Sequence, residues 1–241
     1  MSIQRGIIAL SLCLIGGISF GGIVTAVSKP AEPLSGLFEA RSLPAALQAI
    51  KQPALQAPAW LKAQDAAAAA ARTVTGTRTV TYSVITRGTI TANVAEFKVL
   101  AHQTLNDARG WARLGVSFQE VATGGNFTLV ISEASQVPSF SSGCGAEYSC
   151  RVGRYVIINQ DRWQGATASW NNAGGSLRDY RHMVVNHETG HWLGHDHLSC
   201  GGAGQAAPVM QQQSIDLQGC GFNAWPLQRE LWSTQLGISR V

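Results

Sequence analysis

Residues 187–197 read HETGHWLGHDH, a pattern of histidines and one glutamate that predicts a metal site on a helix. His187 and His191 are four positions apart, so on an α-helix their imidazoles project from one face and both reach a cation about 2 Å away. Gly194 can adopt the left-handed conformation that ends a helix, and the turn would bring His197 to the same cation. Three neutral nitrogen ligands leave the fourth position of a tetrahedral zinc ion to water, which is typical of catalytic zinc sites.

Glu188 follows the first of these histidines, and a rotation of roughly 100° around the helix places it beside the metal. There we expect it to act as general base on the zinc-bound water rather than as a ligand. His182, His195 and Asp196 fall outside the ligand spacing, so we expect them to be outer neighbours of the site or exposed. His102 is alone in another predicted helix, where ordinary packing or exposure is expected.

The helix that carries the motif is predicted over 177–193. Ser176 and Asp179 have the spacing of a capping box, glycines precede them, and no proline interrupts the helix. Judged from the His and Glu content of the chain, the full pattern should arise by chance in roughly one sequence in 10⁵. A surface helix that carries these histidines by coincidence is therefore disfavoured.

The motif resembles the signature of the metzincin clan of zinc peptidases, which is followed by a tight turn containing methionine. Residues 208–210 read Pro-Val-Met and fit that turn. The resemblance implies that Met210 lies beneath the histidines as a hydrophobic floor. The alternative for Met210 is ordinary core packing, which this role largely includes. The run 181–213, with the later pairs 219–220 and 225–226, is similar to a family of bacterial envelope-associated metzincin-like proteins catalogued as a domain of unknown function.

Two further points follow from this resemblance. Some metzincins place a metal-reaching tyrosine shortly after the methionine turn, but no tyrosine follows Tyr180 here, so stabilisation of a transition state by that residue is not expected. His197 stands where some small bacterial relatives use aspartate, which favours a site of three histidines.

The remaining pattern predicts an α+β fold of the metzincin type, with a twisted mixed sheet of about four or five strands and two main helices. Alternating, β-branched runs predict strands over 77–85, 116–121, 127–132 and 155–159. A helix is predicted over 94–109, with Asn93 as N-cap, Glu96 as its box partner and Gly110 beyond its end. A C-terminal helix is predicted over 226–235. In the clan, the strand before the active helix commonly pairs with an extended substrate, so 155–159 or its neighbour is the expected substrate edge.

Four cysteines lie in the predicted globular part, namely Cys144, Cys150, Cys200 and Cys220. An exported chain is expected to oxidise them, and of the three pairings we favour the two local ones, Cys144 with Cys150 and Cys200 with Cys220. The second disulfide would bracket Met210. In the alternative, Cys200 is a fourth zinc ligand, which would close the site and leave Cys220 unpaired.

The N-terminal part of the chain predicts export. Residues 1–27 contain an apolar run that suits a membrane anchor or a signal segment, and its length favours a retained anchor, although 24–26 would suit a signal peptidase. Residues 28–75 are rich in alanine and proline and are expected to form a linker, with a prosegment as the alternative. The catalytic domain is expected over 76–241.

The net charge and the motif together indicate the class of function. The net charge is only +4, and no basic run is present, so nucleic acid is not an expected partner. We expect a monomeric zinc metalloendopeptidase that hydrolyses peptides or proteins outside the membrane, in the cell envelope or the extracellular space. Two alternatives stay open: a zinc-binding envelope protein without turnover, and a hydrolase of cell-wall peptide cross-links.

Overall fold

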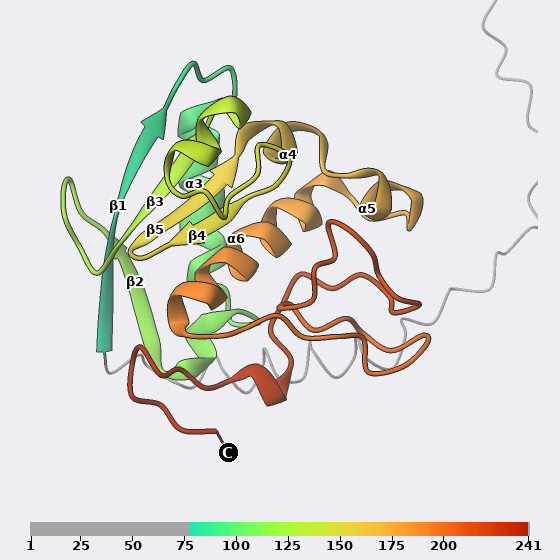
Figure 1. The fold of residues 1–241 in the computed structure, drawn as a ribbon. Coiled ribbons are helices and arrows are strands. Elements are labelled where there is room, and N and C mark those ends of the chain that lie inside the picture. Colours follow the sequence, from blue (N-terminus) through green and yellow to red (C-terminus); the bar gives the residue numbers. More distant parts are fainter. Residues whose placement is uncertain (1–77, 241) are drawn as a thin grey trace, which may run out of the picture. The chain divides into compact units, whose positions relative to one another are not determined.

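A computed structural model describes residues 78–240 (Figure 1). The predicted membrane segment and linker, 1–27 and 28–75, lie outside the described residues. In the described part, no helix has the length and apolar character needed to cross a membrane.

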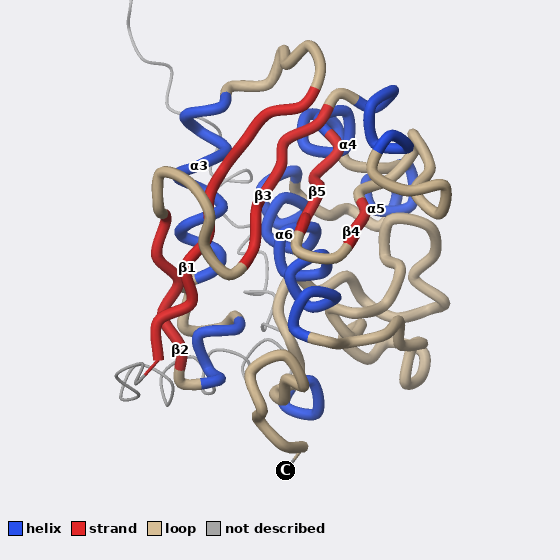
Figure 2. Tube along the Cα trace, turned by 60° about the vertical axis from the view of Figure 1, so that its left-hand side comes forward, coloured by secondary structure: helices blue, strands red, loops and turns tan. Residues whose placement is uncertain are grey.

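One mixed sheet organises the described residues, as the sequence predicts. Its strands are β1 (Arg78–Arg87), β2 (Val116–Glu120), β3 (Phe127–Ser132), β4 (Cys150–Val152) and β5 (Tyr155–Asn159). The strand order is β2-β1-β3-β5-β4, and only β4 runs antiparallel to its neighbour (Figure 2). The strands predicted over 127–132 and 155–159 are confirmed, and those predicted over 77–85 and 116–121 differ from β1 and β2 only at their ends. The sequence did not predict β4, which is too short to show an alternating pattern.

Two long helices, α3 (Val94–Leu105) and α6 (Leu177–Leu193), cover one face of the sheet. The other described helical elements are short: α4 (Gln160–Gly165), α5 (Ala168–Asn172) and the 3₁₀ turns η1 (Trp111–Leu114), η2 (Ala134–Ser139) and η3 (Gln228–Glu230). Figure 2 shows α3 and α6 behind the strands. Their apolar residues join those of the sheet in one core that includes Tyr82, Leu129 and Val184. The opposite face of the sheet packs Val130 and Ile157 in a smaller cluster, on which η2 lies.

The first helix is shorter than predicted. It ends at Leu105, whereas the sequence predicted a helix to 109. The side chain of Asn106 makes two hydrogen bonds with the backbone of Phe118, accepting from its N–H at 2.8 Å and donating to its carbonyl at 2.9 Å. These bonds to β2 hold the chain in a non-helical conformation at Asn106. The predicted N-cap is confirmed, because the Asn93 side chain accepts from the N–H of Glu96.

The predicted C-terminal helix over 226–235 is wrong. Only η3, Gln228–Glu230, is helical there, and the chain continues as an irregular segment. Residues 227–238, called the C-terminal segment below, make hydrogen bonds with distant parts of the chain in place of a helical ladder. One example is the hydroxyl of Ser233, which donates to the carbonyl of Leu193 at the end of α6 at 2.8 Å. Tertiary contacts thus outweigh the local helical pattern.

Candidate metal centre

Helix α6 begins and ends at the residues that the sequence predicts. The Ser176 side chain accepts from the N–H of Asp179 at 3.0 Å and caps the first turn. At the other end Gly194 has a φ of +103°, and a Cβ at this position would lie 2.0 Å from Thr234. The N–H groups of Gly194 and His195 return to carbonyls of the last helical turn, which forms a Schellman motif. This turn carries the chain from the helix toward His197.

The three predicted ligands come together. The Nε2 atom of His191 lies 3.2 Å from Nε2 of His187 and 3.1 Å from Nε2 of His197. Two nitrogens that each lie about 2.05 Å from a tetrahedral zinc ion are separated by about 3.3 Å. The observed separations are therefore close to those that a shared metal requires.

The tautomers of two histidines show what these nitrogens can bind. Nδ1 of His187 lies 2.8 Å from the carbonyl of Val209, and Nδ1 of His191 lies 2.8 Å from the carbonyl of His195. A carbonyl only accepts, so each Nδ1 carries the proton and each Nε2 presents a lone pair. Two lone pairs that face each other at this distance cannot form a hydrogen bond. A cation between them satisfies both, so the donor set fits a metal ion.

Burial keeps these rings neutral. It lowers the pKa of His187 to about 3, with the neighbouring His191 contributing in the same direction. Burial also lowers the pKa of His191 to about 4, and that of the more exposed His197 falls below its ordinary value although Asp196 opposes the shift. Neutral imidazole is the form that ligates a metal, so the three rings are ready to bind one at neutral pH.

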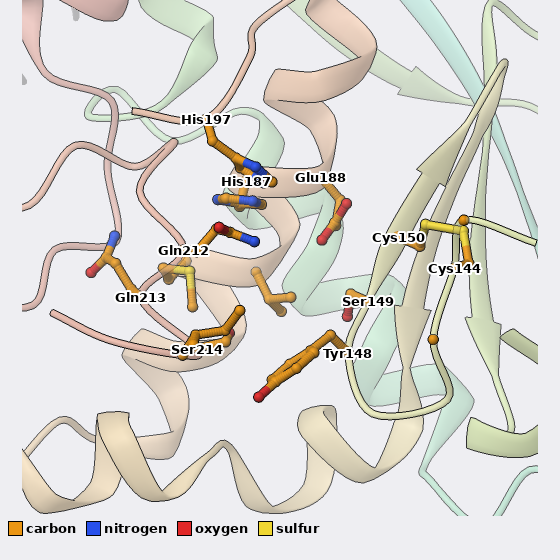
Figure 3. Close-up of a pocket in the computed structure, with 15 residues that line it drawn as sticks. Cys144, Tyr148, Ser149, Cys150, His187, Glu188, His197, Gln212, Gln213 and Ser214 are labelled. Carbon is orange, nitrogen blue, oxygen red and sulfur yellow. A yellow bond between two sulfur atoms is a disulfide. The ribbon is translucent and has the colours of Figure 1, made fainter. Parts of the chain in front are cut away.

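Glu188 faces a cavity next to the histidines. The cavity has a volume of about 240 Å³ and is lined by His187, His197 and Glu188 together with residues of two loops, 143–150 and 212–215. Figure 3 shows the disulfide loop on one side and residues 212–214 on the other. Glu188 is only 5% exposed, and its carboxylate makes no hydrogen bond with any described residue. Burial raises its pKa to about 8.

The methionine turn lies against α6 at the metal-binding face. Met210 is fully buried, and the N–H of Gln211 returns to the carbonyl of Pro208 at 3.0 Å to close the turn. A Cβ added to Gly190 would lie 2.3 Å from the sulfur of Met210. Gly190 lies between His187 and His191 in the helix, so the methionine packs directly beneath the pair, where the resemblance to metzincins placed it.

A buried carboxylate that sequence reasoning missed holds this turn. Glu230 is fully buried, and it accepts from the N–H groups of Val209 at 3.1 Å, Met210 at 2.9 Å and Leu227 at 2.7 Å. Burial raises its pKa, and the three amide donors oppose the rise. Val209 also supplies the carbonyl that orients His187, so Glu230 is linked to the metal site through one residue. Nothing local in the sequence marks this role, because the donors lie about 20 positions away or in a turn.

The C-terminal segment also fixes the second orienting carbonyl. The His195 side chain is 3% exposed, and its Nε2 donates to the carbonyl of Trp232 at 2.9 Å. The ring of His195 packs between the indoles of Trp111 and Trp232, with centroid distances of 5.0 and 4.0 Å. Since the backbone carbonyl of His195 accepts from His191, this residue is an outer neighbour of the site, as expected.

The chain matches a protein family over residues 60–227, which is most of its length; the family is described as a protein of unknown function, DUF3152. The chain belongs to this family. No curated protein matches the sequence. Among solved structures, archaemetzincin from Methanopyrus kandleri is similar, with a TM-score of 0.40 and 11% identity over 63% of this chain and 91% of that chain.

Both local disulfides are present in this DUF3152 member. Cys144 is bonded to Cys150 and Cys200 to Cys220. The alternative in which Cys200 binds zinc is thus wrong, because its sulfur is used in the second disulfide. The first disulfide closes the loop that forms one wall of the cavity in Figure 3.

The other candidate residues lie outside the centre. His182 is buried, so the exposed alternative is wrong, and its Nδ1 lies 2.8 Å from the hydroxyl of Thr104 in α3 and not against any of the three clustered histidines. Burial lowers its pKa. His102 is exposed and contacts the hydroxyl of Tyr82, and Asp196 is exposed. None of these three residues belongs to the cluster of His187, His191 and His197.

Proposed function

We propose that this protein is a zinc-dependent peptidase that hydrolyses peptide bonds of peptides or proteins outside the membrane. The observation that carries the proposal is the convergence of three histidine ring nitrogens within 4.8 Å of one another beside a buried, unpartnered carboxylate. His187, His191 and His197 would hold the zinc. Zinc bound there would act as a Lewis acid, lowering the pKa of water toward about 7 and polarising the carbonyl of the scissile bond.

Glu188 supplies the proton transfers in this proposal. Its carboxylate takes a proton from the attacking water and later gives it to the leaving amine. Two features support this role: the side chain faces the cavity next to His187 and His197, and no described residue engages its oxygens. Its pKa of about 8 describes the chain without a metal, and a neighbouring cation would favour the ionised base.

The edge of the sheet supports binding of an extended substrate. β4 is one of the two edge strands of the sheet, pairs only with β5 among the described strands, and leads out of the loop that lines the cavity. An extended peptide can add to such an edge by main-chain hydrogen bonds. The sequence predicted 155–159 or its neighbour as this edge; β5 is paired on both sides, whereas its neighbour β4 has an open side.

The disulfides support a location outside the cytoplasm. Both Cys144–Cys150 and Cys200–Cys220 need an oxidising compartment to form and persist. The proposal includes a membrane anchor formed by residues 1–27, which lie outside the described part of the chain.

The test compares the wild type with Glu188→Gln, both shown by metal analysis to hold one zinc, on a broad peptide library and on purified cell-wall peptides. Loss of the base should lower kcat by about 10²–10⁴-fold at unchanged zinc content. Glu120→Gln is the control, because it makes the same change on β2, at the opposite edge of the sheet. Equal cleavage by wild type and Glu188→Gln would exclude Glu188 as the base. A zinc-loaded wild type that cleaves no substrate in either set would overturn the proposed function.

A further inference from the structure

Arg151 is the central residue of the edge strand β4, and the register of the strand decides where its side chain lies. Arg151 pairs with Val156 of β5, whereas Cys150 pairs with Ile157. Val156 belongs to the core on the α6 side of the sheet, and Ile157 belongs to the cluster on the opposite side. Side chains that pair across two strands share a face, so Arg151 lies on the α6 side.

The neighbours of Arg151 along the strand confirm this orientation. Cys150 and Val152 pack against the cluster on the far side of the sheet. Since successive side chains of a strand alternate between faces, Arg151 between them must point the other way. That direction is toward the helix that carries Glu188 and the histidines.

The edge strand lies next to the helix of the motif. β4 contacts α6, and the cavity beside Glu188 is lined by Ser149 and Cys150, the two residues that precede Arg151. Arg151 is exposed, and its side chain makes no hydrogen bond or salt bridge with any other residue in 78–240. The free guanidinium donors thus belong to the residue that directly follows the cavity-lining pair Ser149 and Cys150.

The remaining lining of the cavity makes this charge distinctive. Apart from the histidines and Glu188, the cavity is lined by neutral residues, among them Tyr148, Gln212 and Ile215. A basic substrate side chain placed beside Arg151 would be repelled by the guanidinium, and a neutral one would gain no ion pair with it. A carboxylate would find five N–H donors in the planar arrangement that suits bidentate binding.

We propose that Arg151 forms a carboxylate-binding subsite of the cleft, and that the preferred substrates carry aspartate or glutamate close to the scissile bond. The proposal rests on the proposed peptidase function. A peptide strand added to β4 would place one of its side chains about 5 Å, Cβ to Cβ, from that of Arg151 on the same face. The carboxylate could also be the free C-terminus of a short substrate, and the chemistry of the subsite is the same for both.

The test uses matched peptides that carry Glu, Gln or Lys at each position around a cleaved bond, each with a free or an amidated C-terminus. The zinc-loaded wild type should show about a tenfold higher kcat/KM for Glu than for Gln at one position. Arg151→Gln should remove this preference, and Arg151→Glu should shift it toward Lys peptides. A preference that follows the free C-terminus instead of the side chain would overturn the side-chain assignment.

Arg154→Gln and Arg154→Glu are the controls, since they make the same charge changes in the turn after β4, where Arg154 donates to the carbonyl of Gly125 at 2.7 Å. They should keep the wild-type preference. Equal rates for Glu and Gln peptides would overturn the subsite and leave the peptidase intact. If no peptide is cleaved, anisotropy of labelled Glu and Gln peptides on zinc-loaded Glu188→Gln, with and without Arg151→Gln, decides the subsite independently: equal binding overturns it.

Discussion

Replacing Glu230 with glutamine should weaken zinc binding in a protein that still folds. In the wild type one carboxylate oxygen accepts from Met210, and the other accepts from both Val209 and Leu227. Glutamine keeps one acceptor oxygen, so in its best orientation it retains two of these bonds and turns an NH₂ group toward the N–H of Met210. One bond to a charged acceptor is lost, at about 1.5–3 kcal/mol, and a buried donor is left unpaired. We therefore expect the free energy of unfolding to fall by about 3 kcal/mol.

The effect on zinc follows from the link through Val209. The carbonyl of Val209 holds the ring of His187 at 2.8 Å, and the N–H of the same residue is held by Glu230. Changes to the outer partners of a metal site typically cost about 10–100-fold in affinity. The Kd for zinc, measured by competition with a chromophoric chelator, should rise by about this factor.

A control separates zinc affinity from general stability. Leu105→Ala removes a fully buried side chain of α3, which makes none of the hydrogen bonds that hold the methionine turn, and should destabilise the fold by about 2–5 kcal/mol. Its folded state should bind zinc as the wild type does. If Glu230→Gln loses stability to the same degree but keeps the wild-type Kd, the argument that Glu230 positions His187 is refuted.

Three further predictions concern the surroundings of the site. Cys200→Ser with Cys220→Ser opens a disulfide of sequence separation 20 and should lower the unfolding free energy by about 3 kcal/mol, measured in urea; an unchanged midpoint would contradict this. Gly190→Ala forces a methyl group against the methionine turn and should cost about 1–3 kcal/mol, whereas Gly165→Ala, with no atom within 4 Å, should be neutral in the same thermal assay. The zinc-free protein should lose stability as the pH falls below about 6.5. Burial lowers the pKa of His187 to about 3 and the pKa values of His191 and His195 to about 4, so the unfolded chain takes up protons that the folded chain does not, and each group contributes up to about 1.4 kcal/mol per pH unit. The raised pKa values of Glu188 and Glu230 act with the opposite sign and offset part of this loss, because two carboxyl groups oppose three histidines. A flat urea midpoint between pH 6.5 and 4 would refute this.

The parts of the site that could be predicted depend on local signals. The cap at Ser176, the left-handed turn at Gly194 and the spacing of the histidines all act within a few residues, so the sequence alone predicts them correctly. The two local disulfides are also confirmed, because each closes a short loop.

The parts that could not be predicted depend on partners far away in the chain. Asn106 ends α3 because β2 supplies its hydrogen-bond partners, and Glu230 lies in a short 3₁₀ turn instead of a long helix, with two of its three partners in the methionine turn. β4 is only three residues long, and its position comes from pairing with β5. In each case the deciding contact has no trace in the neighbouring residues, so a pattern-based prediction extends the helix or omits the strand.

The C-terminal segment also sets an order of events during synthesis. A nascent chain that has reached His197 already contains the three clustered histidines and the glutamate of the motif. The turn at Val209 and the loop at His195 obtain their fixed positions only when Glu230 and Trp232 have been made. Assembly of the metal site is thus delayed until the sheet and both long helices can form. A protein truncated within this segment would keep the complete motif in its sequence and lack the contacts that orient it.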